Sequence, residues 1–102
     1  MTNAKQELLL AIGSKKIAYG MVKYEEYYGA DPIIISFRDD KEFHELIDHL
    51  DFEYDSGFGR QYIFGCIVFT DKTWLSRSEY DGSEWWKYNF TPNMNYIKDM
   101  LQ

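Results

Sequence analysis

Residues 74–86 read Trp74-Leu75-Ser76-Arg77-Ser78-Glu79-Tyr80-Asp81-Gly82-Ser83-Glu84-Trp85-Trp86. The stretch holds all three tryptophans of the chain and an Asp-Gly dipeptide, which favours a two-residue type I′ turn between antiparallel strands. With Asp81-Gly82 as the centre of this turn, Glu79 lies opposite Glu84. Two residues further along each strand, Arg77 lies opposite Trp86. The stretch therefore predicts a β-hairpin whose register is set by its turn.

The two faces of this hairpin differ in composition, because side chains alternate along a strand with a period of two. One face carries aromatic and charged side chains together: Leu75, Arg77, Glu79, Glu84, Trp86 and Tyr88. The other face mixes large aromatic side chains with serines: Trp74, Ser76, Ser78, Tyr80, Trp85 and Lys87. The second face is suited to packing under a helix.

The first face has two interpretations. In one, arginine, glutamate and tryptophan satisfy one another and fix the register, with a cation–π contact between Arg77 and Trp86. In the other, Arg77, Trp86 and Tyr88 anchor a recognition patch, because Trp, Tyr and Arg dominate interface hot spots. The sequence leaves both open.

Length and composition predict one domain spanning residues 1–102. With 45% hydrophobic and 19% aromatic residues, the chain can form a core without disulfides or a metal. The single cysteine, Cys66, lies in an apolar segment, so we expect a buried free thiol. The polar start and the lack of an apolar run of bilayer length predict a cytoplasmic protein.

The remaining pattern predicts an α+β fold with an antiparallel meander sheet and two to three helices packed on one face. We expect helices near residues 3–12, 40–50 and 93–101, and strands at 16–28, 33–37, 61–70, 74–80 and 83–90. Residues 61–70 are apolar on both faces, which is typical of a central strand. Thr2 or Asn3 can cap the first helix, and Asp39 or Asp40 the second.

Negative charge dominates the chain, with 17 acidic residues against 11 basic ones. A dense run of carboxylates, interrupted by one lysine, lies between residues 39 and 55: Asp39, Asp40, Glu42, Glu45, Asp48, Asp51, Glu53 and Asp55. Such a field repels nucleic acid and attracts basic protein surfaces. The alternative is an ordinary solvated helix face, which is the rule for surface helices.

Catalytic and metal-binding patterns are weak. His44 and His49 are five residues apart, which places them on different helix faces. Glu79 and Glu84 could form a carboxylate pair, but so short a chain leaves little material for a deep cleft. Residues 55–59 contain two glycines, suited to a close backbone approach, yet lack the phosphate-loop pattern. We expect a non-enzymatic protein with no catalytic residue, metal or cofactor.

Three segments carry a resemblance to known proteins: Tyr54-Asp55-Ser56-Gly57-Phe58-Gly59-Arg60-Gln61, Gly65-Cys66-Ile67-Val68-Phe69, and residues 74–86. From about Asp48 onward, the chain resembles a group of small, mostly uncharacterised proteins of tailed bacteriophages and prophages. Where that group often has Asp-Gly-Thr, this chain has Asp71-Lys72-Thr73. The resemblance implies a phage or mobile-element origin. Small acidic phage proteins of this kind resemble inhibitors of host nucleic-acid-binding proteins, including anti-CRISPR and anti-restriction proteins.

Together these features favour a binding protein that inhibits or modulates a host or defence-system protein with a basic nucleic-acid-binding surface. Carboxylates of the second helix would supply the electrostatic attraction: Glu42, Glu45 and Asp48. Hairpin residues would supply specific contacts: Arg77, Glu79, Glu84, Trp86 and Tyr88. One alternative is a small-ligand or nucleotide-binding module that uses Arg77, Arg60 and stacked aromatic rings. Another is a self-associating structural protein that forms a homodimer.

Overall fold

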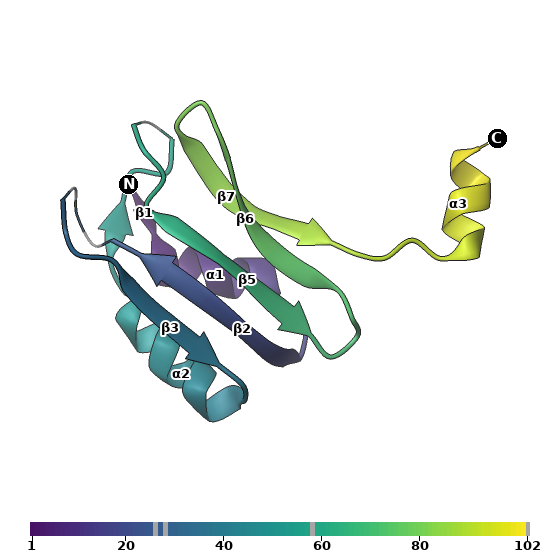
Figure 1. The fold of residues 1–102 in the computed structure, drawn as a ribbon, viewed down its shortest axis with the longest axis horizontal. Coiled ribbons are helices and arrows are strands. Elements are labelled where there is room, and N and C mark those ends of the chain that lie inside the picture. Colours follow the sequence, from purple (N-terminus) through teal and green to yellow (C-terminus); the bar gives the residue numbers. More distant parts are fainter. Residues whose placement is uncertain (26, 28, 58, 102) are drawn as a thin grey trace.

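The computed structural model describes residues 1–25, 27, 29–57 and 59–101. These residues form a five-stranded antiparallel sheet, a separate two-stranded sheet and three helices (Figure 1). The α+β fold class predicted from the sequence is therefore confirmed. Two predicted segments reach beyond the described residues: the strand expected to run to Tyr28, which also spans Glu26, and the loop that contains Phe58.

The elements follow the chain in this order: β1 (Thr2–Asn3), α1 (Ala4–Ile12), β2 (Ile17–Tyr24), β3 (Ile33–Phe37), α2 (Asp40–His49), β4 (Glu53–Tyr54), β5 (Ile63–Phe69), β6 (Trp74–Tyr80), β7 (Ser83–Asn89) and α3 (Met94–Met100). The large sheet has the strand order β3-β2-β5-β6-β7, and β1 pairs with β4. The apolar strand β5 is at the centre of the sheet, as predicted. The strands β5, β6 and β7 form the predicted meander, and β2 joins the β2–β3 hairpin to it.

Side-chain caps define where the first two helices begin. The Asn3 side chain accepts a hydrogen bond from the backbone N–H of Gln6 at 2.9 Å, and α1 ends at Gly13 with φ of 60°. Asp39 caps α2 in the same way, accepting from the N–H of Glu42 at 2.9 Å. Such caps satisfy backbone donors that have no partner inside the helix. Both helix starts were predicted from the sequence.

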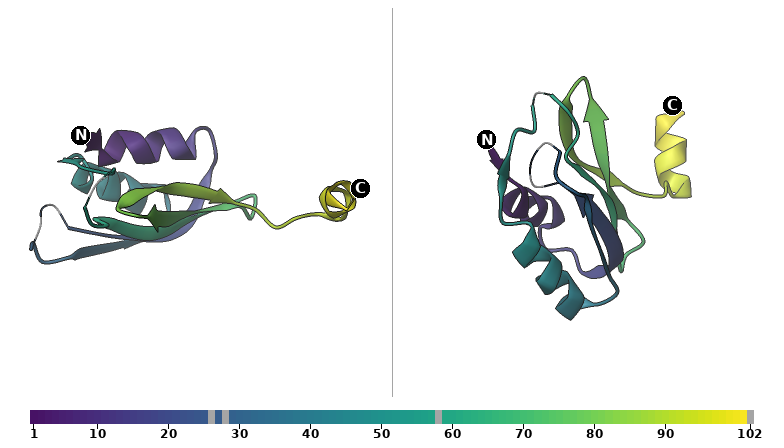
Figure 2. Two further views of the ribbon diagram at one scale, coloured as in Figure 1. Left: turned by 90° about the horizontal axis from the view of Figure 1, so that it is seen from above. Right: turned by 60° about the vertical axis from the view of Figure 1, so that its left-hand side comes forward.

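The hydrophobic core lies between α1, α2 and one side of the large sheet (Figure 2). Apolar side chains of both helices meet the buried side chains of the strands: Leu8, Ile12, Phe43, Leu46, Ile47, Val22, Tyr24, Phe37, Ile63, Ile67, Phe69 and Leu75. The strands β2 and β5 approach closely, since a Cβ at Gly20 would lie 2.5 Å from the carbonyl oxygen of Cys66. Gly20 is therefore required by packing. We call the helix-bearing side of the sheet the covered side.

The covered side of the hairpin is the face with the charged residues. Leu75 pairs with the buried Ile67 of β5 and is itself buried, so Arg77 and Glu84 lie on the same side beneath α1. The expectation that the serine-containing face packs under a helix is wrong. The reason is that β5 sets the side on which the helices lie, and the hairpin follows the register of β5.

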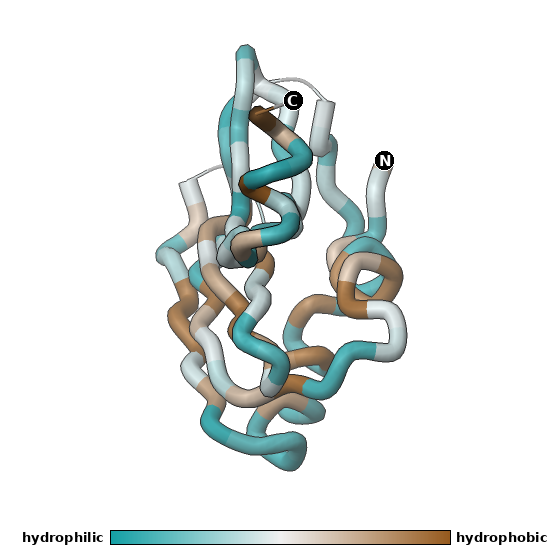
Figure 3. Tube along the Cα trace, turned by 90° about the vertical axis from the view of Figure 1, so that its right-hand side faces the viewer, coloured by the Kyte–Doolittle hydropathy of each residue, from teal (hydrophilic) through white to brown (hydrophobic). Residues whose placement is uncertain are grey.

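The third predicted helix is present, but it packs differently from the other two. None of the described residues of α3 is buried, and the helix projects beyond the end of β7 (Figure 1). In the hydropathy view, α3 carries hydrophobic residues (Figure 3), and its large apolar side chains are exposed. No helix in the described part of the chain is long and apolar enough to cross a membrane.

Candidate functional site

The hairpin that the sequence singled out has the predicted register. Glu79 lies opposite Glu84, and the turn between the strands has positive φ at Asp81 (51°) and at Gly82 (86°). Positive φ at both central residues is the requirement of a type I′ turn. The Glu79 carboxylate also accepts a hydrogen bond from the backbone N–H of Gly82 at 3.0 Å. The turn residues thus fix which side chains share a face.

A buried ion pair lies at the centre of the covered hairpin face. The Arg77 side chain is 1% exposed and the Glu84 side chain 0%. Arg77 donates to Oε1 of Glu84 from Nε at 3.1 Å and from an Nη at 2.8 Å. The same carboxylate accepts from the backbone N–H groups of Tyr62 at 2.7 Å and Ile63 at 3.0 Å. Glu84 therefore connects the hairpin to the start of the central strand.

Two residues distant in the sequence complete this arginine network, which we define as Arg77, Glu84, Glu7 and Tyr54. The other Nη of Arg77 donates to Glu7 of α1 at 2.9 Å. The Tyr54 hydroxyl accepts from Arg77 and donates to the same Glu7 oxygen at 2.5 Å. Burial, followed by the hydrogen bond to Glu7, raises the pKa of Tyr54. The network joins α1, β4 and the hairpin, because the Arg77 guanidinium donates to Glu7, Tyr54 and Glu84.

Aromatic rings flank the guanidinium within this network. The Arg77 guanidinium carbon lies 5.1 Å from the centroid of the Trp86 ring and 5.7 Å from that of Tyr54. The cation–π pair expected across the hairpin is present. Burial alone would lower the pKa of Arg77, but the charge of Glu7 and the contacts with Tyr54 and Glu84 outweigh it and raise the pKa. The guanidinium accordingly remains charged in the interior.

The burial of the network favours the first interpretation for Arg77 and Glu84, whose charges are satisfied inside the protein. Arg77 and Glu84 have no surface with which to touch a partner, so the expectation that they supply binding contacts is corrected. Trp86 is half-buried and packs against the core. The partners Glu7 and Tyr54 were missed in the sequence because each lies far from Arg77 along the chain and no local pattern connects them. The Arg77–Glu84 pair of the hairpin motif is therefore a structural element of the interior.

The other predicted site residues near the hairpin have partners within the chain. Tyr88 is partly exposed, and Lys15 donates to its hydroxyl at 2.9 Å; this hydrogen bond lowers the pKa of Tyr88. Arg60 forms an ion pair with Glu25 and lies over the ring of Tyr62, 5.4 Å from its centroid. The nucleotide-binding alternative relied on Arg77 and Arg60, and both guanidinium groups are already engaged.

The glycine-containing loop before β5 makes its close backbone approach to the hairpin turn. A Cβ at Gly82 would lie 3.0 Å from backbone atoms of Gly59. The backbone N–H of Glu84 donates to the carbonyl of Ser56 at 2.8 Å, and the Ser83 hydroxyl donates to the carbonyl of Gly57 at 3.4 Å. The loop backbone at Gly59 therefore packs against the hairpin turn, where Gly82 leaves room for it.

The acidic surface, defined as Glu42, Glu45 and Asp48 of α2, lies on the outward side of that helix. Glu45 and Asp48 are exposed and Glu42 is half-buried, while Phe43, Leu46 and Ile47 face the core. Within the described part of the chain, no hydrogen bond or ion pair involves these three carboxylate groups. At about 1.5 Å per residue, they spread roughly 9 Å along the helix axis. Their charge is available to a partner.

A second exposed surface lies on the side of the sheet opposite to the helices, which we call the open face. Strand residues that alternate with buried ones form it: Tyr19, Met21, Lys23, Ile34, Phe64, Cys66, Val68, Trp74, Trp85 and Lys87. In the described strands this face carries no Asp or Glu, in a chain of net charge −6. It is therefore an apolar and aromatic surface with a slight positive charge.

Cys66 belongs to this open face, and the expectation of a buried thiol is wrong. The central strand is apolar on both sides, but the helices cover only one of them. Partial desolvation by neighbouring side chains raises the pKa of the Cys66 thiol. A raised pKa keeps the thiol protonated at neutral pH, so Cys66 behaves as a small apolar group.

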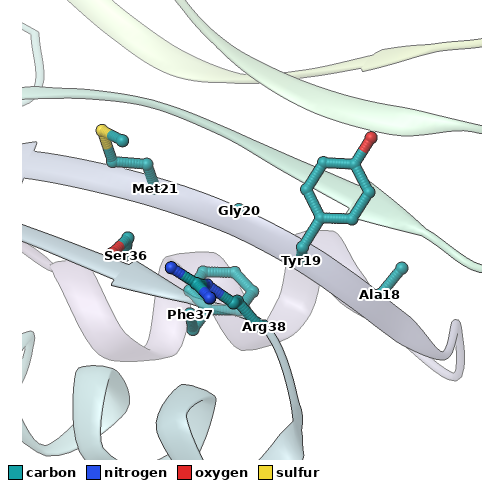
Figure 4. A pocket seen from close by; sticks show the side chains of 7 residues that line it. All are labelled: Ala18, Tyr19, Gly20, Met21, Ser36, Phe37 and Arg38. Atoms are coloured by element: carbon teal, nitrogen blue, oxygen red, sulfur yellow. The ribbon is translucent and has the colours of Figure 1, made fainter.

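The open face is hollowed near the edge strand β3. A shallow depression of about 590 Å³ lies over β2 and β3, where Tyr19 and Met21 stand on the same side of β2 with Gly20 between them (Figure 4). Arg38, at the end of β3, lies at its rim. Two further depressions continue across β2 and β5 along Met21 and Cys66. The hollows are shallow and apolar, a shape suited to side chains of another protein segment.

Comparison with known proteins adds no relative: no protein family, curated protein or solved structure matches the chain.

Proposed function

We propose that the protein is a non-enzymatic binding protein that inhibits or modulates a partner protein by presenting the acidic surface of α2 to a basic patch. The observation that carries the proposal is that Glu42, Glu45 and Asp48 form no ion pair with any residue that the structure describes. Basic side chains of a nucleic-acid-binding partner would meet these carboxylates where phosphates otherwise lie. Electrostatic complementarity of this kind raises association rates and selects the partner.

The charge of the chain is divided between two opposite surfaces. Carboxylates gather around α2 on the helix side, while the open face has no acidic residue in its described strands. Asp39 and Asp51 are partly engaged, because Asp39 caps α2 and Asp51 accepts from the Asn3 side chain at 3.1 Å. Among residues 1–25, 27, 29–57 and 59–101, the carboxylates of Glu42, Glu45 and Asp48 have no such hydrogen-bond or ion-pair partner. Their charge supports recognition better than it supports folding.

The resemblance of residues from Asp48 onward to phage and prophage proteins favours a host or defence-system protein as the partner. An anti-defence role, such as anti-CRISPR or anti-restriction activity, follows from that origin. In this proposal the buried hairpin motif keeps the fold together and α2 carries the recognition. Glu79 and Tyr88, two exposed residues on the covered face of the hairpin, contribute at most at the edge of the contact.

The test is affinity capture from a bacterial lysate with the tagged full chain, followed by binding measurements on the captured protein. The variant Glu42→Gln/Glu45→Gln/Asp48→Asn removes three charges from the acidic surface. The control Asp31→Asn/Asp81→Asn/Asp99→Asn removes three exposed charges elsewhere. We expect the first variant to weaken binding at least tenfold and to flatten its dependence on salt, while the control binds as the wild type does. Equal affinity and salt dependence for the two variants would refute the proposal.

A further inference from the structure

The chain ends in a segment that contacts little of the fold. We define the C-terminal arm as residues 90–101, which leave β7 and include α3. Its large apolar side chains face solvent: Phe90, Met94, Tyr96, Ile97, Met100 and Leu101. The arm projects beyond the sheet in all views (Figures 1 and 2). So much exposed apolar surface in one segment indicates an interaction site.

The helix α3 is too short to be stable without a surface to pack on. It has seven residues, and isolated helices shorter than about 12–15 residues are marginal in water. Its cap is the Asn93 side chain, which accepts from the N–H of Tyr96 at 2.8 Å. Met94, Ile97 and Leu101 are spaced by three and four residues, so they form one apolar stripe along the helix. Burial of this stripe would require an apolar surface on another part of the molecule or on a partner.

The open face is an apolar surface that could receive this stripe. Its centre is formed by Met21, Phe64 and Cys66, with shallow hollows between them. In the described strands, the side chains on this face include no carboxylate that a docked apolar segment would have to desolvate. An apolar stripe on a helix and an uncovered sheet face are thus both present in one chain.

The first residue of the arm, Phe90, packs so that the arm points away from the open face of its own chain. Phe90 stacks on Tyr88, with ring centroids 6.2 Å apart and planes at 29°, and it contacts the Tyr96 ring edge-on at 5.1 Å. Tyr88 lies on the covered side of β7, opposite the buried Leu75, and Lys15 holds its hydroxyl there. To reach the open face of its own sheet, the arm would have to break the Phe90–Tyr88 stack and cross the edge strand.

We propose that the arm of one copy docks on the open face of a second copy, and that the exchange is reciprocal. A twofold dimer of this kind buries both arms and both open faces in one interface. Because both arms and both open faces contribute, the buried area is larger than one arm alone could give. This favours an interface of the roughly 1,200 Å² or more that stable complexes bury. The acidic surfaces of the two copies remain on the outside, so the dimer is compatible with the function proposed above without depending on it.

Sedimentation equilibrium of the full chain over a range of concentrations tests the proposal. We expect the wild type to be a dimer at micromolar concentration, and Ile97→Asp in the arm or Met21→Asp in the open face to weaken dimerisation at least tenfold. The control is Leu10→Asp, which places the same charge at an exposed apolar residue on α1, on the covered side. It should leave the dimer intact. A monomeric wild type, or an Ile97→Asp variant that dimerises as tightly as the wild type, would overturn the proposal.

Photocrosslinking separates docking on a second copy from docking on the same chain. Ile97 is 41% exposed and lies outside the hydrophobic core, so a photoreactive phenylalanine analogue at this position leaves the core unchanged. We expect a covalent dimer whose crosslinks map to β2 or β5. Crosslinks confined to single chains, or crosslinked dimers that map to α1 or α2, would contradict the proposed arrangement. Neither experiment involves the acidic surface, so failure here leaves the proposed function standing.

Discussion

Along the central strand β5, neighbouring residues face two different environments. Ile67 is fully buried beneath the helices, whereas Cys66 and Phe64 face solvent on the open side. The covered side combines an apolar core with a buried arginine network, and the open side combines apolar and aromatic groups with two lysines. The ion pair at the centre of the conspicuous hairpin motif is therefore interior, whereas the open side of the same strands remains available to a partner.

The comparison shows that the charge of a residue in a sequence motif does not reveal whether its side chain is exposed in the fold. Glu84 accepts hydrogen bonds from Arg77 and from two backbone N–H groups, so its charge is compensated inside the protein. Glu45 of α2 has no such partner in the described part of the chain. We infer that the first carboxylate holds the fold together and that the second is free for recognition. The predictions below test this difference between the two sides.

The largest effect is expected at Arg77. Arg77→Met leaves Glu84 as an uncompensated buried charge, which we expect to lower the free energy of unfolding by about 3–5 kcal/mol. The matched control is Lys87→Met on the open side of the same hairpin, with an expected change within about 0.5 kcal/mol. Urea denaturation measures both. If the two variants lose similar stability, the covered and open sides do not differ as described.

Substitutions at two isoleucines compare the stability contributed by the covered and open sides without changing any charge. Ile67 is 0% exposed on the covered side, and Ile34 is 61% exposed on the open side. We expect Ile67→Ala to cost about 2–5 kcal/mol, because it removes buried methyl groups and leaves a cavity. Ile34→Ala should cost less than about 1 kcal/mol. Urea denaturation at low protein concentration, where the proposed dimer dissociates, gives both values; a larger loss at Ile34 would reverse the assignment of the faces.

Tyr54 gives a smaller effect with a characteristic dependence on pH. Tyr54→Phe removes a hydroxyl that donates to Glu7 and accepts from Arg77, and we expect a loss of about 1–3 kcal/mol at pH 7. Because burial and the bond to Glu7 raise the pKa of Tyr54, the fold holds the neutral phenol. Its contribution is full below the unfolded value of about 10 and is lost as pH rises above it.

Unfolding curves of the wild type and Tyr54→Phe at pH 7, 9 and 10.5 test this sign. The difference between the two proteins should be constant up to pH 9 and smaller at pH 10.5. A difference that grows with pH would mean that the folded state favours the phenolate, contrary to the network described.

The smallest effect is expected at Asp71, on the surface. Hydrogen bonds from Lys15 at 2.5 Å and from Thr73 lower the pKa of Asp71 to about 2. The folded state therefore favours the carboxylate, and its stabilisation is full above the unfolded value of 3.8 and is lost as pH falls through about 2. The melting temperature of Asp71→Asn should lie slightly below that of the wild type at pH 6 and converge with it near pH 2. Asp31→Asn, a control at an exposed carboxylate, should melt at the same temperature as the wild type at pH 6.

Local signals in the sequence predicted most of the elements. The Asp-Gly dipeptide determined the hairpin register, and Asn3 and Asp39 marked the starts of two helices. Side-chain alternation divided the hairpin into two faces but could not tell which face the helices cover. That choice depends on long-range packing of α1 and α2 against β5. For the same reason the exposure of Cys66 was predicted wrongly.

The candidate site was less predictable than the fold. Arg77 was recognised as unusual, but its partners Glu7 and Tyr54 come from α1 and β4, and only the folded chain brings them together. Without them, the motif is as easily a surface patch as an interior network. The acidic surface was easier to predict, because charge on the outer side of an amphipathic helix needs no tertiary partner.

A double-mutant cycle between Arg77 and Glu84 tests the central claim most directly, namely that these two hairpin residues form an ion pair in the protein interior. Arg77→Met, Glu84→Gln and the double variant are each unfolded in urea, and the three losses are compared. We predict a coupling free energy of about 2 kcal/mol or more, because once one charge is gone the removal of the other relieves a buried, unpaired group. Losses that add to within about 0.5 kcal/mol would show that the two side chains act independently, and would contradict the account.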